Sequence, residues 1–245
     1  MIDVVYFTTN HSFSDHRELR FSLRSLALYI SGVQRVFVAG SRPTWLRGVV
    51  HLPEADPFTH NKDANIIRKM LAVCQPERGL SNPFLFVNDD HYFSQDGEAV
   101  AFPYYHKGEL KGGPSLHREY SRRLANTRRL LAGWGRPTRN YDVHTPILIH
   151  PACFREIFNT FYWLDLAGPG VVMKSVYANS RPEIAGVYLA DCKLTARTHG
   201  SVEGWLEVLR QRPCWSTGEH LPRLVWQLLE RLYPEPSSYE AGPRR

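Results

Sequence analysis

Short apolar runs alternate with segments of helical periodicity from the second residue of the chain onward, and no other feature constrains the fold more. Buried strands are predicted at residues 2–7, 33–39, 83–87, 141–149 and 186–190, with a further strand within 45–52. Helices are predicted to begin near residues 15, 61, 151 and 221. This alternation is typical of an α/β fold, in which a mostly parallel sheet is flanked by helices.

Capping residues place the ends of these helices. Asp15 and Glu18 have the spacing of a capping box, and Ser31-Gly32 is expected to end the first helix. Residues 61–63 open the second helix, and Pro151 takes the first position of the third. The apolar face of the third helix is predicted to include Phe154, Ile157, Phe158 and Phe161.

Length and cysteine usage indicate one domain that needs no covalent staple. A chain of 245 residues can bury a sizeable core. Its four cysteines are scattered and form no C-x-x-C pair, which favours small buried side chains in a reducing compartment. No apolar run approaches the ~20 residues of a membrane helix, and no signal peptide is recognised. We therefore expect a cytoplasmic single domain over residues 1–245, with a tail at 234–245 that wraps or frays.

The positive charge of the chain is concentrated in one segment. The net charge is +6, and residues 107–139 hold nine basic residues against two acidic ones, a local balance of +7 that leaves about −1 elsewhere. Such a segment attracts polyanions, although a solvated helix face is the plainer interpretation. Residues 97–140 are also rich in Gly, Pro, Tyr and Arg, and include Gly112-Gly113-Pro114. We interpret them as a basic insertion lobe over the ligand edge of the sheet, which faces a nucleotide, a nucleic acid or an acidic glycan.

The most specific local motif is Asn88-Asp89-Asp90-His91, which follows the apolar run at 83–87. A buried strand of this kind delivers adjacent carboxylates to its carboxyl end, the edge where ligands bind in open α/β sheets. Adjacent carboxylates suit a hard divalent cation that takes its remaining ligands from phosphate and water. The alternative interpretation is that Asp89 or Asp90 caps a turn.

Other polar residues are weaker candidates. His144 stands on a predicted strand edge, where it could be a general base or a structural histidine. His60-Asn61-Lys62-Asp63 puts a cation and a carboxylate at a helix start, which suits an anion or an ordinary N-cap. The weakest candidates are Lys174, Arg181 and Asp191. The sequence contains no P-loop, dinucleotide-binding glycine motif, G-x-S-x-G elbow or H-E-x-x-H motif.

Several blocks resemble the Stealth proteins, which are sugar-phosphate transferases of microbial capsule synthesis related to the lysosomal N-acetylglucosamine-1-phosphotransferase. The blocks keep their order over most of the chain: Ile2-Asp3-Val4-Val5-Tyr6, Glu18-Leu19-Arg20-Phe21-Ser22-Leu23-Arg24-Ser25-Leu26, Val36-Phe37-Val38 with Pro43-Thr44-Trp45-Leu46, Phe86-Val87-Asn88-Asp89-Asp90, Val143-His144-Thr145-Pro146 and Leu189-Ala190-Asp191-Cys192. The second and fourth blocks are fairly specific. The ending at 232–240 looks like the tails of small glycosyltransferase-like relatives in capsule loci and phages.

The resemblance implies a glycosyltransferase-A-like (GT-A-like, Rossmann-like) catalytic domain that uses a nucleotide-sugar donor and a divalent metal. Asp89 and Asp90 would hold the metal, and the implied catalytic residues are His144 as base, Asp90 and Asp191. The donor-binding set is Thr8, Arg20, Arg24, Lys62, Asp63 and Asn88, of which Lys62 and Asp63 come from the helix-start motif. The family continues its first block as T-W-V-D-G, whereas this chain has Phe7-Thr8-Thr9-Asn10-His11. The change from an acidic residue to Asn10 bears on which group is transferred more than on the fold or the donor.

Three functions remain open from the sequence. The leading hypothesis is a glycosyltransferase that uses a nucleotide-diphosphate sugar, with UDP as the expected nucleotide and Mn²⁺ or Mg²⁺ as the metal. Its acceptor would be a hydroxyl on a polyanion, for which hydroxymethylated phage DNA is one candidate, with the base reached or flipped. The alternatives are Stealth-type transfer of a sugar-1-phosphate to a glycan, and a nucleic-acid-binding module without catalysis. The sequence does not indicate an oligomeric state.

Overall fold

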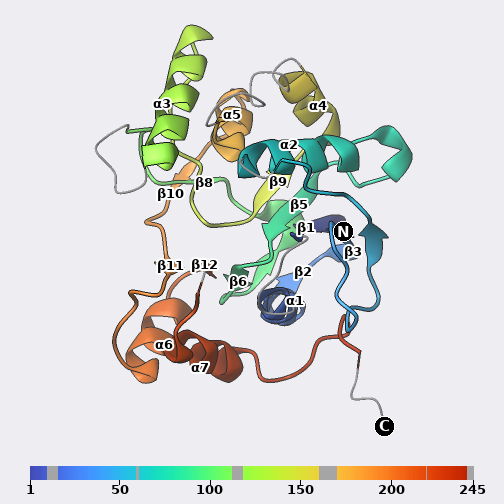
Figure 1. Ribbon diagram of the computed structural model, residues 1–245, viewed down its shortest axis with the longest axis vertical. Coiled ribbons are helices and arrows are strands. Elements are labelled where there is room, and N and C mark those ends of the chain that lie inside the picture. Colours follow the sequence, from blue (N-terminus) through green and yellow to red (C-terminus); the bar gives the residue numbers. More distant parts are fainter. Residues whose placement is uncertain (10–15, 59–60, 112–117, 160–169, 219, 242–245) are drawn as a thin grey trace.

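A computed structural model describes residues 1–9, 16–58, 61–111, 118–159, 170–218 and 220–241 (Figure 1). Its central sheet has the strand order β4-β3-β1-β5-β9, formed by Val50–Leu52, Val33–Ala39, Ile2–Phe7, Phe84–Asn88 and Ile147–Ile149. The first four run parallel, and β9 lies antiparallel to β5 at the edge. This arrangement confirms the predicted α/β class with a mostly parallel sheet.

Helices cover both faces of this sheet. Helix α1 (Arg17–Tyr29) lies on one face, and α2 (Lys62–Val73), α4 (Pro151–Asn159) and α5 (Met173–Asn179) lie on the other (Figure 1). Strand β1 shows why both faces need a cover, because its successive side chains are all buried and enter the two cores alternately. A strand buried on both sides reads as a continuous apolar run, which is how the sequence predicted it.

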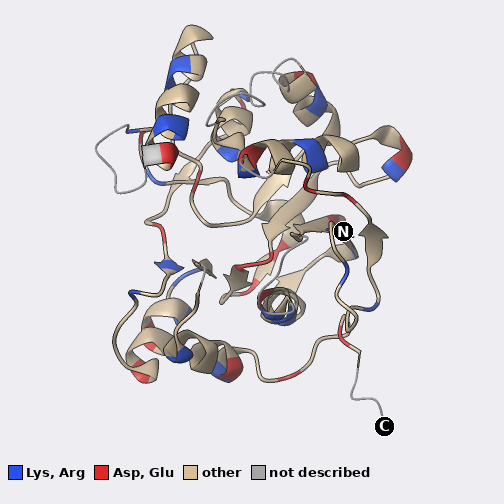
Figure 2. Cartoon of the chain, viewed as in Figure 1, with Lys and Arg blue, Asp and Glu red and all other residues tan. Residues whose placement is uncertain are grey.

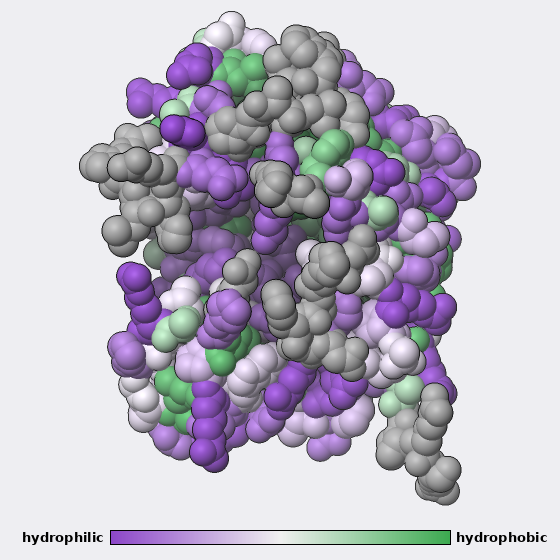
Figure 3. Space-filling view, viewed as in Figure 1, coloured by the Kyte–Doolittle hydropathy of each residue, from purple (hydrophilic) through white to green (hydrophobic). Residues whose placement is uncertain are grey.

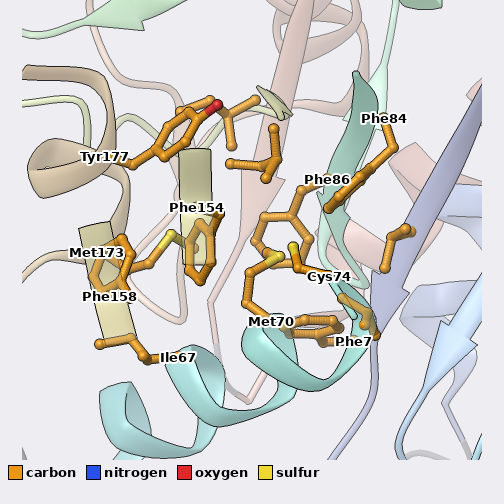
Figure 4. Close-up of a cluster of buried hydrophobic side chains, with 14 of the residues drawn as sticks. Phe7, Ile67, Met70, Cys74, Phe84, Phe86, Phe154, Phe158, Met173 and Tyr177 are labelled. Carbon is orange, nitrogen blue, oxygen red and sulfur yellow. The ribbon is translucent and has the colours of Figure 1, made fainter. Parts of the chain in front are cut away.

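The two cores differ in what fills them. On the α2 side, Phe154 stacks on Phe158 at 4.4 Å between ring centroids, and Phe7 packs against Phe86 at 4.7 Å. Figure 4 shows these rings with Met70 from α2 between the sheet and the helices. On the α1 side, the helix contributes mainly leucines. The aromatic core thus anchors α4 and α5 beside the strand that leads to Asn88-Asp89-Asp90.

A second, smaller sheet follows the acidic turn. It has the order β11-β12-β6, formed by Lys193–Leu194, Cys214–Thr217 and His91–Phe93, with β12 antiparallel to β6. Helices α6 (Val202–Arg210) and α7 (Arg223–Leu232) pack against it around the fully buried Trp215. Because β6 begins directly after Asp90, the acidic turn joins the two sheets.

Residues 97–140 contain more regular structure than the predicted lobe. They include β7 (Gly97–Glu98), a 3-10 turn at Ala99–Ala101, β8 (Tyr105–His106) and helix α3 (Arg118–Gly133). Gly112-Gly113-Pro114 lies outside the described residues. Two short parallel pairings tie the segment to the rest of the chain: β7 pairs with β2 (Ile30–Ser31), and β8 pairs with β10 (Val187–Tyr188). The Gly-, Pro- and Arg-rich composition obscured helix α3, whose narrow apolar face consists of Tyr120, Leu124 and Leu131 at helical spacing.

Several predicted borders were wrong. The first helix ends at Tyr29, not at Ser31-Gly32, because residues 30–31 are extended and pair with β7. The strand predicted at 141–149 shrinks to β9, and the one at 186–190 shrinks to β10. The chain before β9 is held by other elements; the amide of Tyr141, for example, donates to Ser175 Oγ at 2.9 Å.

The predicted helix starts fared differently. Asn61 is the N-cap of α2, and its Oδ1 accepts from the amide of Ala64 at 3.0 Å. Helix α4 begins at Pro151 as predicted. Asp15 of the capping box and Phe161 lie outside the described residues. A 3-10 turn at Pro76–Arg78 follows α2.

The tail wraps the domain as far as Ala241. The amide of Arg47 donates to the Tyr239 carbonyl at 2.8 Å, and the amide of Ala241 donates to the Trp45 carbonyl at 2.7 Å. Between these contacts, the Glu240 carboxylate binds Arg24 of α1. Within the described ranges, no helix combines the length and the apolar character that crossing a membrane requires.

Candidate active site

The acidic turn lies at the carboxyl ends of the parallel strands, where the two sheets meet. Asn88 ends β5 beside Phe7 of β1, and Asp89 and Asp90 form the turn into β6. Figure 2 shows acidic segments near the middle of the molecule, and Figure 3 shows a hydrophilic hollow on the same face, between the upper helices and α6 and α7. The turn is therefore at the edge where ligands of open α/β sheets bind.

Negative charge in this turn is poorly compensated. Burial, together with the neighbouring charges of Asp90 and Glu18, raises the pKa of the Asp89 carboxyl to about 8 against the opposing effect of Lys62. Asp90 Oδ1 is buried and accepts no hydrogen bond within the described part of the chain. His91 Nε2 lies 3.9 Å from that oxygen, beyond hydrogen-bond distance.

His91 is neutral in this setting. Burial lowers the pKa of its imidazole well below the usual value, and the charges of Lys174 and His144 lower it further. The Asn88 amide donates to its Nδ1 at 3.3 Å, which places the ring hydrogen on Nε2. Nε2 is buried and, like Asp90 Oδ1, has no hydrogen-bond partner among the described residues.

These features fit a hard divalent cation. Two adjacent carboxylates, one with a buried oxygen that has no hydrogen-bond partner among the described residues, could supply part of a coordination shell that phosphate oxygens and water would complete. No group of three or more His, Cys, Asp or Glu within the described ranges could hold an ion by itself. Asp89 and Asp90 would thus supply the protein ligands, and the donor would supply others.

A second polar cluster is built around Asp191, from segments far apart in sequence. The His144 ring nitrogen Nδ1 lies 2.8 Å from Asp191 Oδ2, and the His144 amide donates to Oδ1 at 3.2 Å. Lys107 Nζ donates to the same Oδ2 at 2.9 Å. Burial alone would raise the pKa of the Asp191 carboxyl, but the hydrogen bond and charge of His144, together with Lys107, hold it well below the usual value. An ionised Asp191 fixes the imidazole through Nδ1 and leaves Nε2 to accept a proton.

The loop that carries His144 is held from two helices. Tyr120 of α3 donates to Asp142 Oδ2 at 2.8 Å. Lys174 of α5, which is buried, donates to the Thr145 carbonyl at 2.7 Å. Burial alone would raise the pKa of the Asp142 carboxyl, but the charges of His144, Lys107 and Lys174 and the hydrogen bond from Tyr120 lower it. The loop is therefore a fixed part of the site.

The predicted donor-binding residues divide into two groups, of which the first lies near the turn. Asn88 is part of the strand end, and the exposed Lys62 at the start of α2 acts electrostatically on Asp89. Thr8 directly follows β1. It is buried, and its hydroxyl donates to the Ser41 carbonyl at 2.7 Å. This bond uses the hydroxyl hydrogen of Thr8, which is therefore not available to a nucleotide sugar.

The second group is engaged elsewhere. Arg24 donates to both oxygens of Glu240 at 2.8 and 2.7 Å, and Arg20 lies 3.6 Å from the same carboxylate, so both brace the tail. Asp63 pairs with Arg123 and joins α2 to α3. Arg181, one of the weakest candidates, follows α5 and donates to the Tyr177 hydroxyl and to the Glu183 carboxylate. His60 lies outside the described residues.

Sequence reasoning overlooked several residues of the site. Lys107 was counted only as part of the basic segment, and Glu18 only as part of a capping box and of a resemblance block, without a role at the site. Asp142 directly precedes the Val143-His144-Thr145-Pro146 block, and His91 ends the Asn88-Asp89-Asp90-His91 motif, so both could have been found from their neighbours. Tyr120 carried no signal, because its contact with Asp142 depends on where α3 packs.

Comparison with known proteins gives sequence similarity over part of the chain. No family model matches it. The chain is 29% identical over 107 residues to the N-acetylglucosamine-1-phosphotransferase subunits alpha/beta of Mus musculus and of Homo sapiens. The match covers 40% of this chain and 8% of each relative, so the chain spans a small part of their length. This similarity confirms the resemblance expected from the sequence blocks.

Two solved structures are similar over most of the chain. One is a glycosyltransferase involved in the glycosylation of the major capsid of PBCV-1, with 13% identity, 94% of this chain and 98% of that chain covered, and a TM-score of 0.42. The other is mouse xyloside xylosyltransferase 1 in its apo form, with 10% identity, 90% and 99% covered, and a TM-score of 0.46.

Proposed function

We propose that this protein is a metal-dependent glycosyltransferase with a GT-A-like catalytic domain. It would move a sugar from a nucleotide-diphosphate sugar, with UDP as the expected nucleotide, to a hydroxyl of a polyanionic acceptor. One observation carries the proposal: the under-compensated pair Asp89–Asp90 and the oriented pair His144–Asp191 occupy the ligand edge together, and the buried Lys174 lies near enough to interact with Asp90, Asp142 and Asp191. The sequence similarity to a phosphotransferase named for N-acetylglucosamine supports a sugar-bearing substrate.

The pairs Asp89–Asp90 and His144–Asp191 have separate roles in this reaction. Asp89 and Asp90 would hold Mn²⁺ or Mg²⁺, which when bound neutralises the diphosphate of the donor. Lys62 adds a positive charge on the same side. His144 takes the acceptor proton on Nε2 while the acceptor oxygen attacks C1 of the sugar and the C1–O bond to the diphosphate breaks. Asp191 stabilises the resulting imidazolium, and Lys107 limits how basic Asp191 becomes.

A donor screen with Mn²⁺ or Mg²⁺, followed by mass spectrometry of both products, tests this function. We expect transfer or slow hydrolysis of one nucleotide sugar, release of the nucleoside diphosphate, and loss of both with EDTA. The Asp89→Asn and Asp90→Asn variants should behave like the chelated enzyme. Metal-independent turnover, or none with any donor, would contradict the proposal.

Sugar-1-phosphate transfer is the second candidate, and the 107-residue match favours it. The acceptor then attacks phosphorus and the nucleoside monophosphate leaves, so the same mass spectra separate the two reactions: UDP marks glycosyl transfer and UMP marks phosphotransfer. A silent nucleic-acid-binding module would instead bind DNA with a steep salt dependence and show no donor turnover.

The acceptor surface is proposed to be helix α3 and the turn that follows it. Within α3 and the turn after it, the exposed arginines for which the described residues give no ion pair are Arg122, Arg128, Arg129, Arg136 and Arg139. Lys107 and Arg123 are already engaged with Asp191 and Asp63. Tyr120 joins the first turn of α3 to the His144 loop, so a chain bound along α3 would lead to the base.

An acceptor comparison tests this surface. Hydroxymethylated DNA and an acidic glycan are offered to the wild type and to an Arg128→Ala/Arg129→Ala variant at two salt concentrations. We expect the KM for the true acceptor to rise several-fold and its salt dependence to weaken, since about two anionic contacts are removed. An Arg210→Ala/Arg223→Ala variant, which changes exposed arginines of α6 and α7, is the matched control. Activity that is the same with and without the DNA excludes DNA as the acceptor.

We also propose that the reaction takes place in the cytoplasm. The four cysteines are free thiols, which supports a reducing compartment.

A further inference from the structure

Lys174 is a buried cation whose position the proposed reaction does not yet use. It stands in α5 with 7% of its surface exposed. Its Nζ donates to the Thr145 carbonyl at 2.7 Å and lies 3.5 Å from the Val143 carbonyl. These two carbonyls flank His144, so one ammonium group holds the backbone on both sides of the proposed base.

Helix α5 is a rigid support for this ammonium. Its residues Met173, Val176 and Tyr177 are buried in the aromatic core beside α4 (Figure 4). Next to Lys174, Ser175 Oγ accepts from the amide of Tyr141 at 2.9 Å, and the helix therefore contacts the loop at several points. Because α5 is packed in the core, the bonds from Lys174 hold the His144 backbone in a fixed position relative to the core.

The surroundings also explain why a lysine is tolerated there. Burying an ammonium group is costly unless carboxylates and acceptors compensate it. Burial lowers the pKa of Lys174, while Asp142, Asp90 and Asp191 act in the opposite direction. The ammonium is therefore near the carboxylates of Asp90, Asp142 and Asp191. The Val143 and Thr145 carbonyls accept its hydrogen bonds.

We propose that Lys174 is a positioning residue that fixes the Val143–Thr145 backbone so that Nε2 of His144 faces the acceptor hydroxyl. The inference rests on the proposed function of His144. It differs from a purely structural role in one respect: the effect of removing the ammonium on turnover must pass through His144.

A double-mutant cycle tests this dependence. Lys174→Met, which keeps the length of the side chain and removes its donors, is measured in the wild type and in a His144→Ala background. We expect kcat to fall about 10- to 100-fold in the wild type, because a displaced base is strongly impaired, with the donor KM within about twofold. In the His144→Ala background the same substitution should change kcat by less than about twofold. Lys174→Arg, which keeps a charged donor, should recover part of the loss.

Lys69 offers a matched control. It is a second buried lysine, on α2, and its Nζ donates to the Thr8 carbonyl at 2.7 Å and pairs with Asp56 at 2.7 Å. The effect of Lys69→Met on kcat should be the same with and without His144. Equal behaviour of Lys174→Met in both backgrounds would overturn the inference and leave the function intact.

Two further outcomes are decisive. If the wild type turns over no donor, the proposed function fails, and the inference that rests on it fails with it. If Lys174→Met does not fold, Lys174→Gln enters the same cycle, because it removes the charge and keeps an N–H donor. A kcat loss that persists undiminished in the His144→Ala background again counts against positioning.

Discussion

The Asp191 carboxylate shows how a single residue sets the state of the proposed base. Its Oδ2 accepts from both His144 and Lys107, and its Oδ1 accepts from the His144 amide. Side chain and backbone of His144 are thus fixed to one carboxylate. Because Lys107 also donates to Oδ2, part of the negative charge of Asp191 is already balanced before the His144 imidazole becomes positive.

Replacing Asp191 by Asn should impair turnover without unfolding the protein. An amide can present an N–H to Nδ1 and favour the wrong tautomer, so we expect kcat to fall roughly 10²- to 10⁴-fold with a smaller change in donor KM. Steady-state kinetics measures this, with Asp96→Asn as the control at an exposed carboxylate. Unchanged kcat in Asp191→Asn would exclude His144 as the base oriented by this residue.

At the level of elements, helix α1 and the tail form one unit. Arg24 binds Glu240 with two hydrogen bonds and also donates to the Tyr233 carbonyl at 3.1 Å. The Ser237 amide donates to Glu240 at 2.8 Å. Burial alone would raise the pKa of the Glu240 carboxyl, but the bonds from Arg24 and Ser237 and the charges of Arg24 and Arg20 hold it below the usual value. The side chain of Glu240 is only 5% exposed, so the pair is well shielded from water.

The Glu240→Gln substitution should lower the free energy of unfolding by about 2–3 kcal/mol at pH 7. Because the folded pKa is depressed, this stabilisation is fully present above the unfolded pKa of about 4.3. It is then lost as the pH falls through the lower folded value. Urea denaturation of both proteins at neutral and acidic pH measures the difference, which should shrink on acidification. The control is Glu235→Gln, at an exposed position of the same tail, and a constant difference at all pH values would contradict the assignment.

At the scale of the whole molecule, the amino and carboxyl ends of the parallel strands differ in how their carboxylates are bonded. At the amino edge, Asp3 is fully buried and accepts from Arg35 at 2.9 and 2.7 Å and from the Ser81 amide at 2.8 Å. At the carboxyl edge, Asp90 has a buried oxygen to which no group in the described ranges donates a hydrogen bond. Satisfied charges at one edge stabilise the fold, and an unsatisfied one at the other is available to a ligand.

Matched Asp→Asn substitutions at the two edges should therefore have opposite effects. Asp3→Asn should reduce the free energy of unfolding by about 2–4 kcal/mol, because it removes the charge that Arg35 pairs with, and should leave the donor KM unchanged. Asp90→Asn should leave stability equal or higher while metal-dependent turnover disappears. Chemical denaturation and kinetics of both variants measure this. A large loss of stability in Asp90→Asn would mean that this carboxylate supports the fold.

Local sequence determined much of this architecture. The mostly apolar runs at 2–7, 33–39 and 83–87 predicted buried strands, because a strand covered on both faces has little room for alternating polar residues. The end of the third run placed Asp89 and Asp90 at the ligand edge, since parallel strands share one carboxyl edge. Periodicity of this kind is read within one element, and so the sequence alone is enough.

Tertiary structure alone decided which side chains meet. His144 bonds Asp191, which lies 47 positions away, and Lys107 bonds the same carboxylate from 84 positions away. Lys174 bonds the carbonyls on either side of His144 from 31 and 29 positions away. The partner of Arg24 lies 216 residues away in the tail, and the block that contains Arg24 gives no sign of this contact. No local pattern records such contacts, because they arise only when the packing of α3, α5 and the tail brings the segments together.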